Sequence, residues 1–162
     1  MKLDAEKYLF NHAIRYLGKY PATKKRIEEY LRKKINNKKT YQKSIFPKNF
    51  DKEILINEIV NKLDELNIIN ESHYLESMFF HYQKSLFSIR KIKSKLYQKG
   101  FDEKKIEEHI SNQLQENPEI EVNILRKYIL KKKLEDLEVN ELKKKLYQQS
   151  FSESSIYEVI KE

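Results

Sequence analysis

Residues 92–110 read IKSKLYQKGFDEKKIEEHI, and residues 142–160 read LKKKLYQQSFSESSIYEVI. The two stretches lie fifty residues apart, align without a gap and are identical at ten of their nineteen positions. A repeat of this length indicates an array of small helical units rather than one irregular globule. The matched positions include apolar and aromatic pairs that we expect to face inward on two consecutive helices: Leu96 and Leu146, Tyr97 and Tyr147, Phe101 and Phe151, Ile106 and Ile156, Ile110 and Ile160.

A weaker third copy lies upstream, where residues 23–35 read TKKRIEEYLRKKI. A shift of sixty-five residues places Ile27 on Ile92, Leu31 on Leu96 and Lys34 on Lys99. The extra fifteen residues fall in the stretch NNKKTYQKSIFPKNF, which is polar, basic and broken by proline. This stretch therefore reads as an inserted loop over residues 36–50.

The repeats predict an all-α chain of three tandem three-helix units, which resemble helix-turn-helix repeats and stack in an elongated, curved array. The first unit covers residues 1–68 and contains the basic loop 36–50. The second covers residues 69–117 and the third residues 118–162. Two glycines, three prolines and the lack of strand-like alternation also favour helices. An elongated surface suits an elongated partner.

The expected helix ends follow from capping residues. Thr23, Asp51, Ser88 and Asp102 are placed as N-caps, and Gly100 stands where a left-handed C-terminal cap belongs. Ser150 occupies the equivalent position in the last copy, so that turn carries left-handed strain or uses another cap. Helical spacing further predicts a first helix over residues 4–20, a helix over 122–137, and these inward residues: Phe10, Ala13, Ile14, Leu17, Leu55, Ile59, Leu63, Leu66, Tyr74, Met78 and His81 or Tyr82.

Composition excludes several classes of protein. The chain has no cysteine, so disulfides and thiolate metal sites are excluded. No apolar run reaches the roughly 18 residues of a membrane span, and the N-terminus lacks the apolar core of a signal peptide, so we expect a cytoplasmic protein with no membrane partner.

No catalytic group of residues stands out. The sequence has no glycine-rich phosphate loop and no nucleophile elbow, and we interpret its glutamates as solvated helix faces. We therefore expect no enzyme activity and no cofactor. We also expect no metal site, because the four histidines have scattered spacings: His12, His73, His81 and His109.

Positive charge is concentrated at one end of the chain. Residues 1–50 carry 14 Lys or Arg and 4 Asp or Glu, a net charge of +10. The net charge is +1 over residues 51–100 and −3 over residues 101–162. A basic N-terminal region suits phosphate binding, whereas a general lysine bias would not explain why acidic residues avoid it.

Two basic helices supply the candidate contacts with nucleic acid or phosphate. The first offers Lys24, Lys25, Arg26, Arg32, Lys33 and Lys34. Aromatic residues are interleaved with these and with the loop lysines 38, 39, 43 and 48, as in surfaces that stack unpaired bases: Tyr30, Tyr41 and Phe46. The competing interpretation is a solvated lysine face with tyrosine in the core.

The second basic helix and the segment before it offer Lys84, Arg90, Lys91, Lys93, Lys95 and Lys99. Two of these, Lys93 and Lys95, recur as Lys143 and Lys145, although shared ancestry alone can produce such recurrence. Residues 131–133 are three lysines in an acidic region, and we expect them to be solvated.

The whole chain resembles the RecX family of bacterial recombination regulators. The family's opening pattern is matched by AIRYLGKYPATKKRIEEYLRKK, and its next turn by residues 68–74. The family pattern I-x-x-x-L-x-x-K-G-[IF] is matched throughout by Ile92, Leu96, Lys99, Gly100 and Phe101, and its C-terminal pattern by Leu146, Phe151 and Ile156. The chain departs from the family where Leu86, Ser88 and Ser150 replace glycines.

The resemblance implies a non-enzymatic regulator of the RecA recombinase, active in DNA repair, homologous recombination and the SOS response. Such a protein binds the RecA–DNA filament and inhibits its ATPase, strand exchange and filament growth. The implied partners are the RecA filament and single-stranded DNA, with double-stranded DNA left open, and we expect a monomer. Two alternatives are a stand-alone helix-turn-helix DNA-binding regulator, which would need base-reading side chains on one helix, and a pure protein scaffold.

Overall fold

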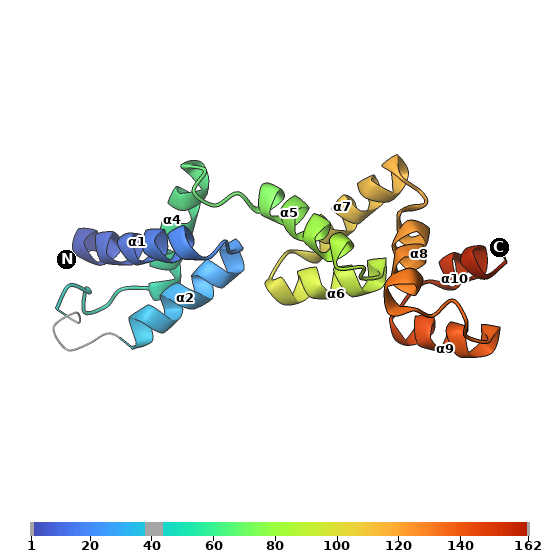
Figure 1. Ribbon diagram of the computed structural model, residues 1–162. Coiled ribbons are helices and arrows are strands. Elements are labelled where there is room, and N and C mark those ends of the chain that lie inside the picture. The colour runs from blue at the N-terminus through green and yellow to red at the C-terminus, as the bar shows by residue number, and fades with distance from the viewer. Residues whose placement is uncertain (1, 38–43, 162) are drawn as a thin grey trace. The chain divides into compact units, whose positions relative to one another are not determined.

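The computed structural model describes residues 2–37 and 44–161. Nine α-helices and no β-strand occur in these residues, which confirms the predicted all-α class. The chain divides into two compact units, Met1–Tyr74 and Leu75–Glu162 (Figure 1). The second compact unit contains most of the predicted second unit and all of the predicted third. The division into three three-helix units stays a prediction.

The first compact unit is built from α1 (Lys2–Lys19), α2 (Lys24–Asn36) and α4 (Lys52–Glu65). Its core is formed by aliphatic side chains from all three helices, among them Leu9, Ile27, Leu31, Ile59 and Leu63, each fully buried. In α1 the buried face is Ala5, Leu9 and Ala13, so the predicted stripe is rotated and three of its members lie at the margin: Phe10, Ile14 and Leu17.

Leu66, which the helical spacing predicts to face inward, is 55% exposed. The reason is that α4 ends at Glu65, so Leu66 no longer follows the helical spacing of the residues before it. Ile69 is buried in the same core three residues later. A periodic pattern extended past the end of a helix therefore selects the wrong residue.

The second compact unit contains six helices, the first of which begins just before the unit boundary. They are α5 (Glu71–Lys84), α6 (Ile89–Lys99), α7 (Glu103–Glu116), α8 (Ile120–Lys132), α9 (Val139–Gln148) and α10 (Glu153–Ile160). In α5 the buried residues are Leu75, Phe79 and Tyr82, so of the two alternatives His81 and Tyr82 the structure confirms Tyr82. Met78, also predicted to face inward, is only half-buried, and His81 is exposed. The helix expected over residues 122–137 ends earlier, because Lys133 adopts a left-handed conformation with φ 54°.

Most of the predicted caps are confirmed. The side chains of Thr23, Asp51 and Ser88 accept hydrogen bonds from the backbone N–H groups of Arg26, Glu53 and Lys91 at 3.2, 2.9 and 3.2 Å. Asp102 occupies the N-cap position of α7 without a side-chain capping bond, and Ser152 caps α10 through the N–H of Ser155 at 3.2 Å. Local side-chain chemistry therefore sets where these helices begin.

The turns that end α6 and α9 have the same backbone geometry. Gly100 has φ 100° and Ser150 has φ 66°, both left-handed. In each turn a phenylalanine N–H donates back to a leucine carbonyl, from Phe101 to Leu96 at 3.4 Å and from Phe151 to Leu146 at 3.3 Å. This is the Schellman pattern of helix termination. The serine keeps the turn at the expense of left-handed strain, as the sequence predicts.

Candidate nucleic-acid interface

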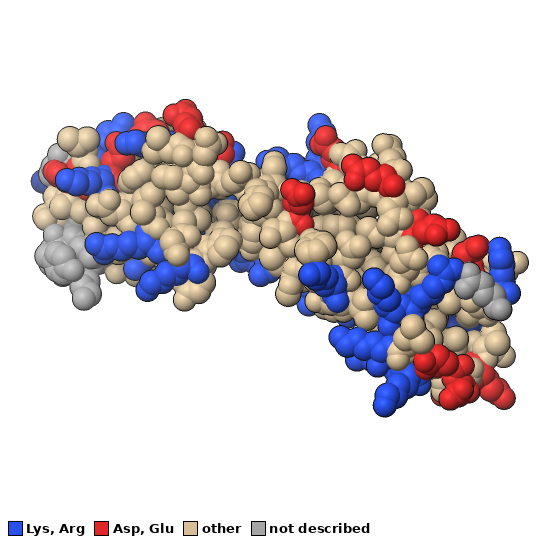
Figure 2. Space-filling model, turned by 45° about the horizontal axis from the view of Figure 1, so that its top comes forward, with Lys and Arg blue, Asp and Glu red and all other residues tan. Residues whose placement is uncertain are grey.

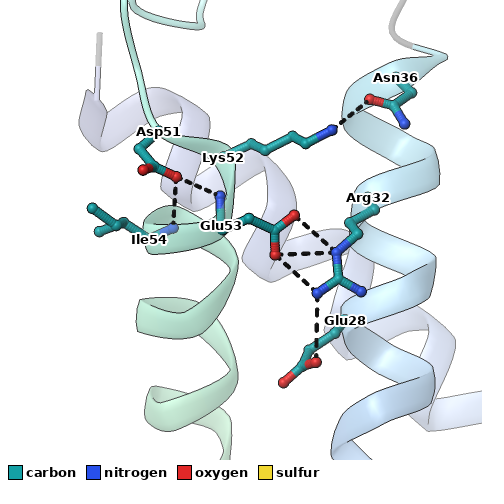
Figure 3. A network of polar contacts seen from close by, with 7 residues as sticks. All are labelled: Glu28, Arg32, Asn36, Asp51, Lys52, Glu53 and Ile54. Carbon is teal, nitrogen blue, oxygen red and sulfur yellow. Dashed lines mark hydrogen bonds and ion pairs between the residues drawn. The ribbon is translucent and has the colours of Figure 1, made fainter.

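The basic helix α2 is tied to α4 through Arg32. Its guanidinium contacts the Glu53 carboxylate with two nitrogens, Nε to Oε1 at 2.9 Å and Nη2 to Oε2 at 2.8 Å (Figure 3). The hydrogen bond raises the pKa of Arg32 and lowers the pKa of Glu53. Glu28 completes the group at 3.7 Å from Nη2. Arg32 is therefore engaged inside its own unit, although the sequence pattern assigns it to a ligand.

Two further predicted contacts are also engaged within the first compact unit. Lys24 pairs with Asp64 at 2.7 Å, and Arg26 pairs with Glu29 at 3.2 Å. These pairs lie at the surface, where an ion pair adds little stability and can open for a stronger partner. They nonetheless reduce the positive potential that this helix presents.

Lys25 and Lys33 are the exposed lysines of α2 that have no ion-pair partner among the described residues. Lys34 lies over the ring of Tyr30 at 5.6 Å, and the centre of that ring lies 4.5 Å from the centre of the Tyr16 ring in a tilted arrangement. Burial raises the pKa of the Tyr30 hydroxyl. Phe46 is only 5% exposed and packs into the core, so its predicted role in base stacking is wrong. Tyr41 and lysines 38, 39 and 43 lie outside the described residues.

The second basic group lies on α6 and at the end of α5. Arg90 is exposed, whereas Lys93 forms an ion pair with Glu107 of α7, and this contact raises the pKa of Lys93. Lys84 lies over the Phe80 ring at 4.6 Å and Lys91 over the Phe87 ring at 4.4 Å. Lys95 is half-buried, and Lys99 is exposed at the end of the helix. On the face that Figure 2 shows, Lys and Arg side chains gather in patches on both compact units.

The repeated tyrosines do not face inward. Tyr97 is 61% exposed and Tyr147 is 48% exposed, although their neighbours Leu96 and Leu146 are fully buried. Adjacent positions on a helix point about 100° apart, so both members of a Leu-Tyr pair cannot face one narrow core. The exposed tyrosine is thus a repeated surface feature and not a core residue.

A pair of glutamates that sequence reasoning assigns to solvent instead holds helix N-termini. Glu121, only 7% exposed, accepts hydrogen bonds from the backbone N–H groups of Ile89 at 2.9 Å and Ser152 at 3.0 Å. It therefore joins the starts of α6 and α10. Glu71 accepts from the N–H of Lys24, the first residue of α2, at 2.6 Å.

The two glutamates occupy corresponding places. Glu71 and Glu121 differ by the fifty-residue repeat, and Lys24 and Ile89 differ by the sixty-five-residue shift of the weak copy. Both amides follow a capping hydroxyl residue, Thr23 or Ser88. An alignment extended upstream of the nineteen-residue block would have paired these glutamates.

A groove of about 720 Å³ lies within the second compact unit and is mixed in charge. Basic, acidic and aromatic side chains line it, including Arg90, Lys93, Glu107, Tyr147 and Glu153. A smaller cavity of about 220 Å³ lies where α6, α8 and the end of α9 meet. The lining of this second cavity includes three lysines: Lys91, Lys131 and Lys132. Lys131 and Lys132 are exposed, as expected of solvated lysines. They also line this cavity, which the sequence does not predict.

The described residues contain no cluster of three or more His, Cys, Asp or Glu side chains that could hold a metal ion. Two histidines, His12 and His109, are half-buried. Desolvation lowers the pKa of His109, while Glu76 and Glu116 oppose that shift, and desolvation with Lys34 and Arg15 lowers the pKa of His12. The Nε2 atom of His109 is buried without a hydrogen-bond partner in the described structure. In the same residues no helix has the length and apolar character that crossing a membrane requires.

The chain matches no protein-family model and no curated protein. Its fold is similar to that of RecX from Lactobacillus salivarius, whose crystal structure aligns with a TM-score of 0.73 at 23% sequence identity. The alignment covers 98% of this chain and 96% of that chain. The likeness establishes a shared helical fold over essentially the whole length.

Proposed function

We propose that this chain regulates the RecA recombinase by binding the RecA–DNA filament and inhibiting its ATPase, strand exchange and filament growth. The observation that carries the proposal is the fold similarity to RecX over 98% of the chain. The residue patterns described above support it independently, because the same chain carries them in the family's order. The proposal describes a monomer without enzyme activity that works in the cytoplasm, where RecA filaments form on DNA.

Binding to DNA in this proposal relies on charge and not on base reading. Lys25 and Lys33 are exposed and available on α2, and Arg90 is exposed on α6. Lysine contacts with phosphates fix position without reading sequence. A stand-alone regulator with one preferred duplex sequence would instead require Arg, Asn or Gln at base edges, and preference for one duplex sequence in a binding assay would favour that alternative.

A titration of RecA's DNA-dependent ATP hydrolysis tests the proposal directly. The intact chain should lower the hydrolysis rate in a concentration-dependent manner. The absence of inhibition at stoichiometric excess, with the chain shown to be folded by circular dichroism, would overturn the assignment to RecA.

The double variant K25E/K33E tests the DNA contribution. It should weaken binding to single-stranded DNA across all sequences, and the salt dependence should fall by about 0.7 in log–log slope for each phosphate that the variant no longer neutralises. The matched control is K7E/K19E, which makes the same charge change at exposed positions of α1. Equal weakening in both variants would mean that net charge alone matters and would remove α2 from the interface.

A further inference from the structure

The 220 Å³ cavity combines three segments that are distant in sequence. The connection between α5 and α6 contributes residues 85–88, and the first turn of α6 contributes Lys91. The end of α8 contributes Tyr128, Lys131 and Lys132, and Gln149 follows α9. The hydroxyl of Ser88 donates to the Gln149 carbonyl at 2.9 Å, which fixes two of these segments together. The cavity is thus a built feature of the second compact unit.

The charged residues that line this cavity are all positive. Lys91, Lys131 and Lys132 line the cavity, and none of the described residues that line it is acidic. The larger groove in the same compact unit differs, because Glu107, Glu121 and Glu153 line it beside its cations. Three cations around one cavity without a carboxylate favour an anion there.

The position of Lys91 strengthens this reading. Lys131 and Lys132 lie in the last turn of α8, where the helix dipole favours cations, so their presence has an ordinary structural reason. Lys91 lies in the first turn of α6, where the dipole disfavours a cation. An anion bound in the cavity would compensate for this unfavourable position.

The side chain of Lys91 is also held in place. Its ammonium lies 4.4 Å from the centre of the Phe87 ring and 3.4 Å from Oε1 of Gln149. An ammonium group has three donors, and the Gln149 contact uses one of them. The cavity volume of about 220 Å³ is several times the ~30 Å³ that one water molecule occupies in the liquid. The cavity therefore has room for a tetrahedral anion.

We propose that this cavity, the lysine pocket, binds a phosphate group through Lys91, Lys131 and Lys132. The inference goes beyond regulation of RecA and stands on the cavity alone. The phosphate can come from a polynucleotide backbone or from a free phosphate compound, and the two sources share the same recognition chemistry. The acidic balance of residues 101–162 conceals this local concentration of positive charge.

Amide NMR spectra of the full chain, titrated separately with inorganic phosphate and with an oligothymidylate, test the proposal. The amides of residues 85–91, 128–132 and 149 should shift with one or both ligands. Shifts with inorganic phosphate alone identify a free compound as the source, and shifts with the oligonucleotide alone identify the polynucleotide. Shifts confined to other residues, or no shift with either ligand, would overturn the proposal.

A pair of double variants provides the quantitative test. K131E/K132E should reduce affinity for the ligand that shifts the pocket amides by about tenfold, because two charged groups that attract the anion become repulsive. The control K143E/K144E reverses two adjacent lysines on α9 that do not line the pocket. An equal reduction in both variants would refute the pocket. Inhibition of RecA is measured separately, so failure of the pocket and failure of the RecA proposal give different results.

Discussion

The two copies of the repeat, α6–α7 and α9–α10, bury equivalent residues but differ in the turn between their helices and in the length of the second helix. Leu96 and Leu146 are both fully buried, and Ile106 and Ile156 are each 1% exposed. The left-handed residue between the helices is glycine in one copy and serine in the other. The helix after it has 14 residues in α7 and 8 in α10. The buried leucine and isoleucine positions are thus preserved while cap chemistry and helix length vary.

The largest expected effect comes from breaking the glutamate junction, in which Glu121 accepts hydrogen bonds from the backbone N–H groups of Ile89 and Ser152 and so joins the two copies. Glu121→Ala leaves the N–H groups of Ile89 and Ser152 without their acceptor, one in each copy. Hydrogen bonds to a charged group contribute about 1.5–3 kcal/mol each, so we expect the loss of both to lower the free energy of unfolding by about 3–6 kcal/mol. Urea denaturation followed by circular dichroism measures it.

The conservative variant Glu121→Gln is the control for this junction. Its amide oxygen can accept one of the two bonds, so its destabilisation should be smaller than that of the alanine variant. Glu158→Ala on α10, which lies outside the junction, should change stability by less than about 0.5 kcal/mol in either direction, the range of ordinary surface substitutions. Equal stability of Glu121→Ala and the parent chain would show that the junction carries no energy.

An intermediate effect separates the two left-handed turns. Gly100→Ala introduces a Cβ at φ 100° and should destabilise its copy by about 1–2 kcal/mol. Ser150→Gly should act in the opposite direction and stabilise by up to about 1 kcal/mol, because relief of strain exceeds the entropy that glycine adds to the unfolded chain. Urea midpoints of the two variants should therefore move apart, and a common direction would contradict the equivalence of the turns.

The smallest expected effect is a pH dependence of stability that only the first copy contributes. His109 of the first copy aligns with Val159 of the second, which does not titrate. Desolvation lowers the pKa of folded His109 below 6.5, so the unfolded chain binds the proton first as pH falls. The free energy of unfolding should therefore decrease as pH falls below about 6.5 and stop decreasing below the folded pKa. Denaturation of the His109→Val variant between about pH 7.5 and 5 should show a flatter dependence. His12, whose pKa is also lowered, remains in both proteins and provides a constant background.

The sequence predicts the helical class and most helix starts, because periodicity and capping are local properties. Thr23, Asp51 and Ser88 illustrate this, since each cap depends on residues within one turn. The prediction for Tyr97 and Tyr147 fails because identity between copies is not a sign of burial. The prediction for Leu66 fails because the helix ends one residue before it.

The candidate interface was less predictable than the fold. Whether a surface cation is available depends on its partners, and Arg32 finds its main partner Glu53 twenty-one residues away on another helix. The lysine pocket likewise joins residues 91, 131 and 149, whose proximity no local pattern encodes. In the sequence Glu121 cannot be distinguished from a solvated glutamate, because the two N–H groups that donate to it belong to helices distant along the chain.

The glutamate junction also determines how such a chain could be lengthened. The acceptor that completes the start of α6 belongs to α8, outside the nineteen-residue block, and the acceptor for α2 belongs to α5. Duplicating α6 and α7 without the helix that follows them would produce a copy in which the first amide of the α6 equivalent has no carboxylate to accept from it. A designer who wished to add another module would therefore transplant the helix that follows as well, since the repeating part of this protein is longer than the stretch in which its letters repeat.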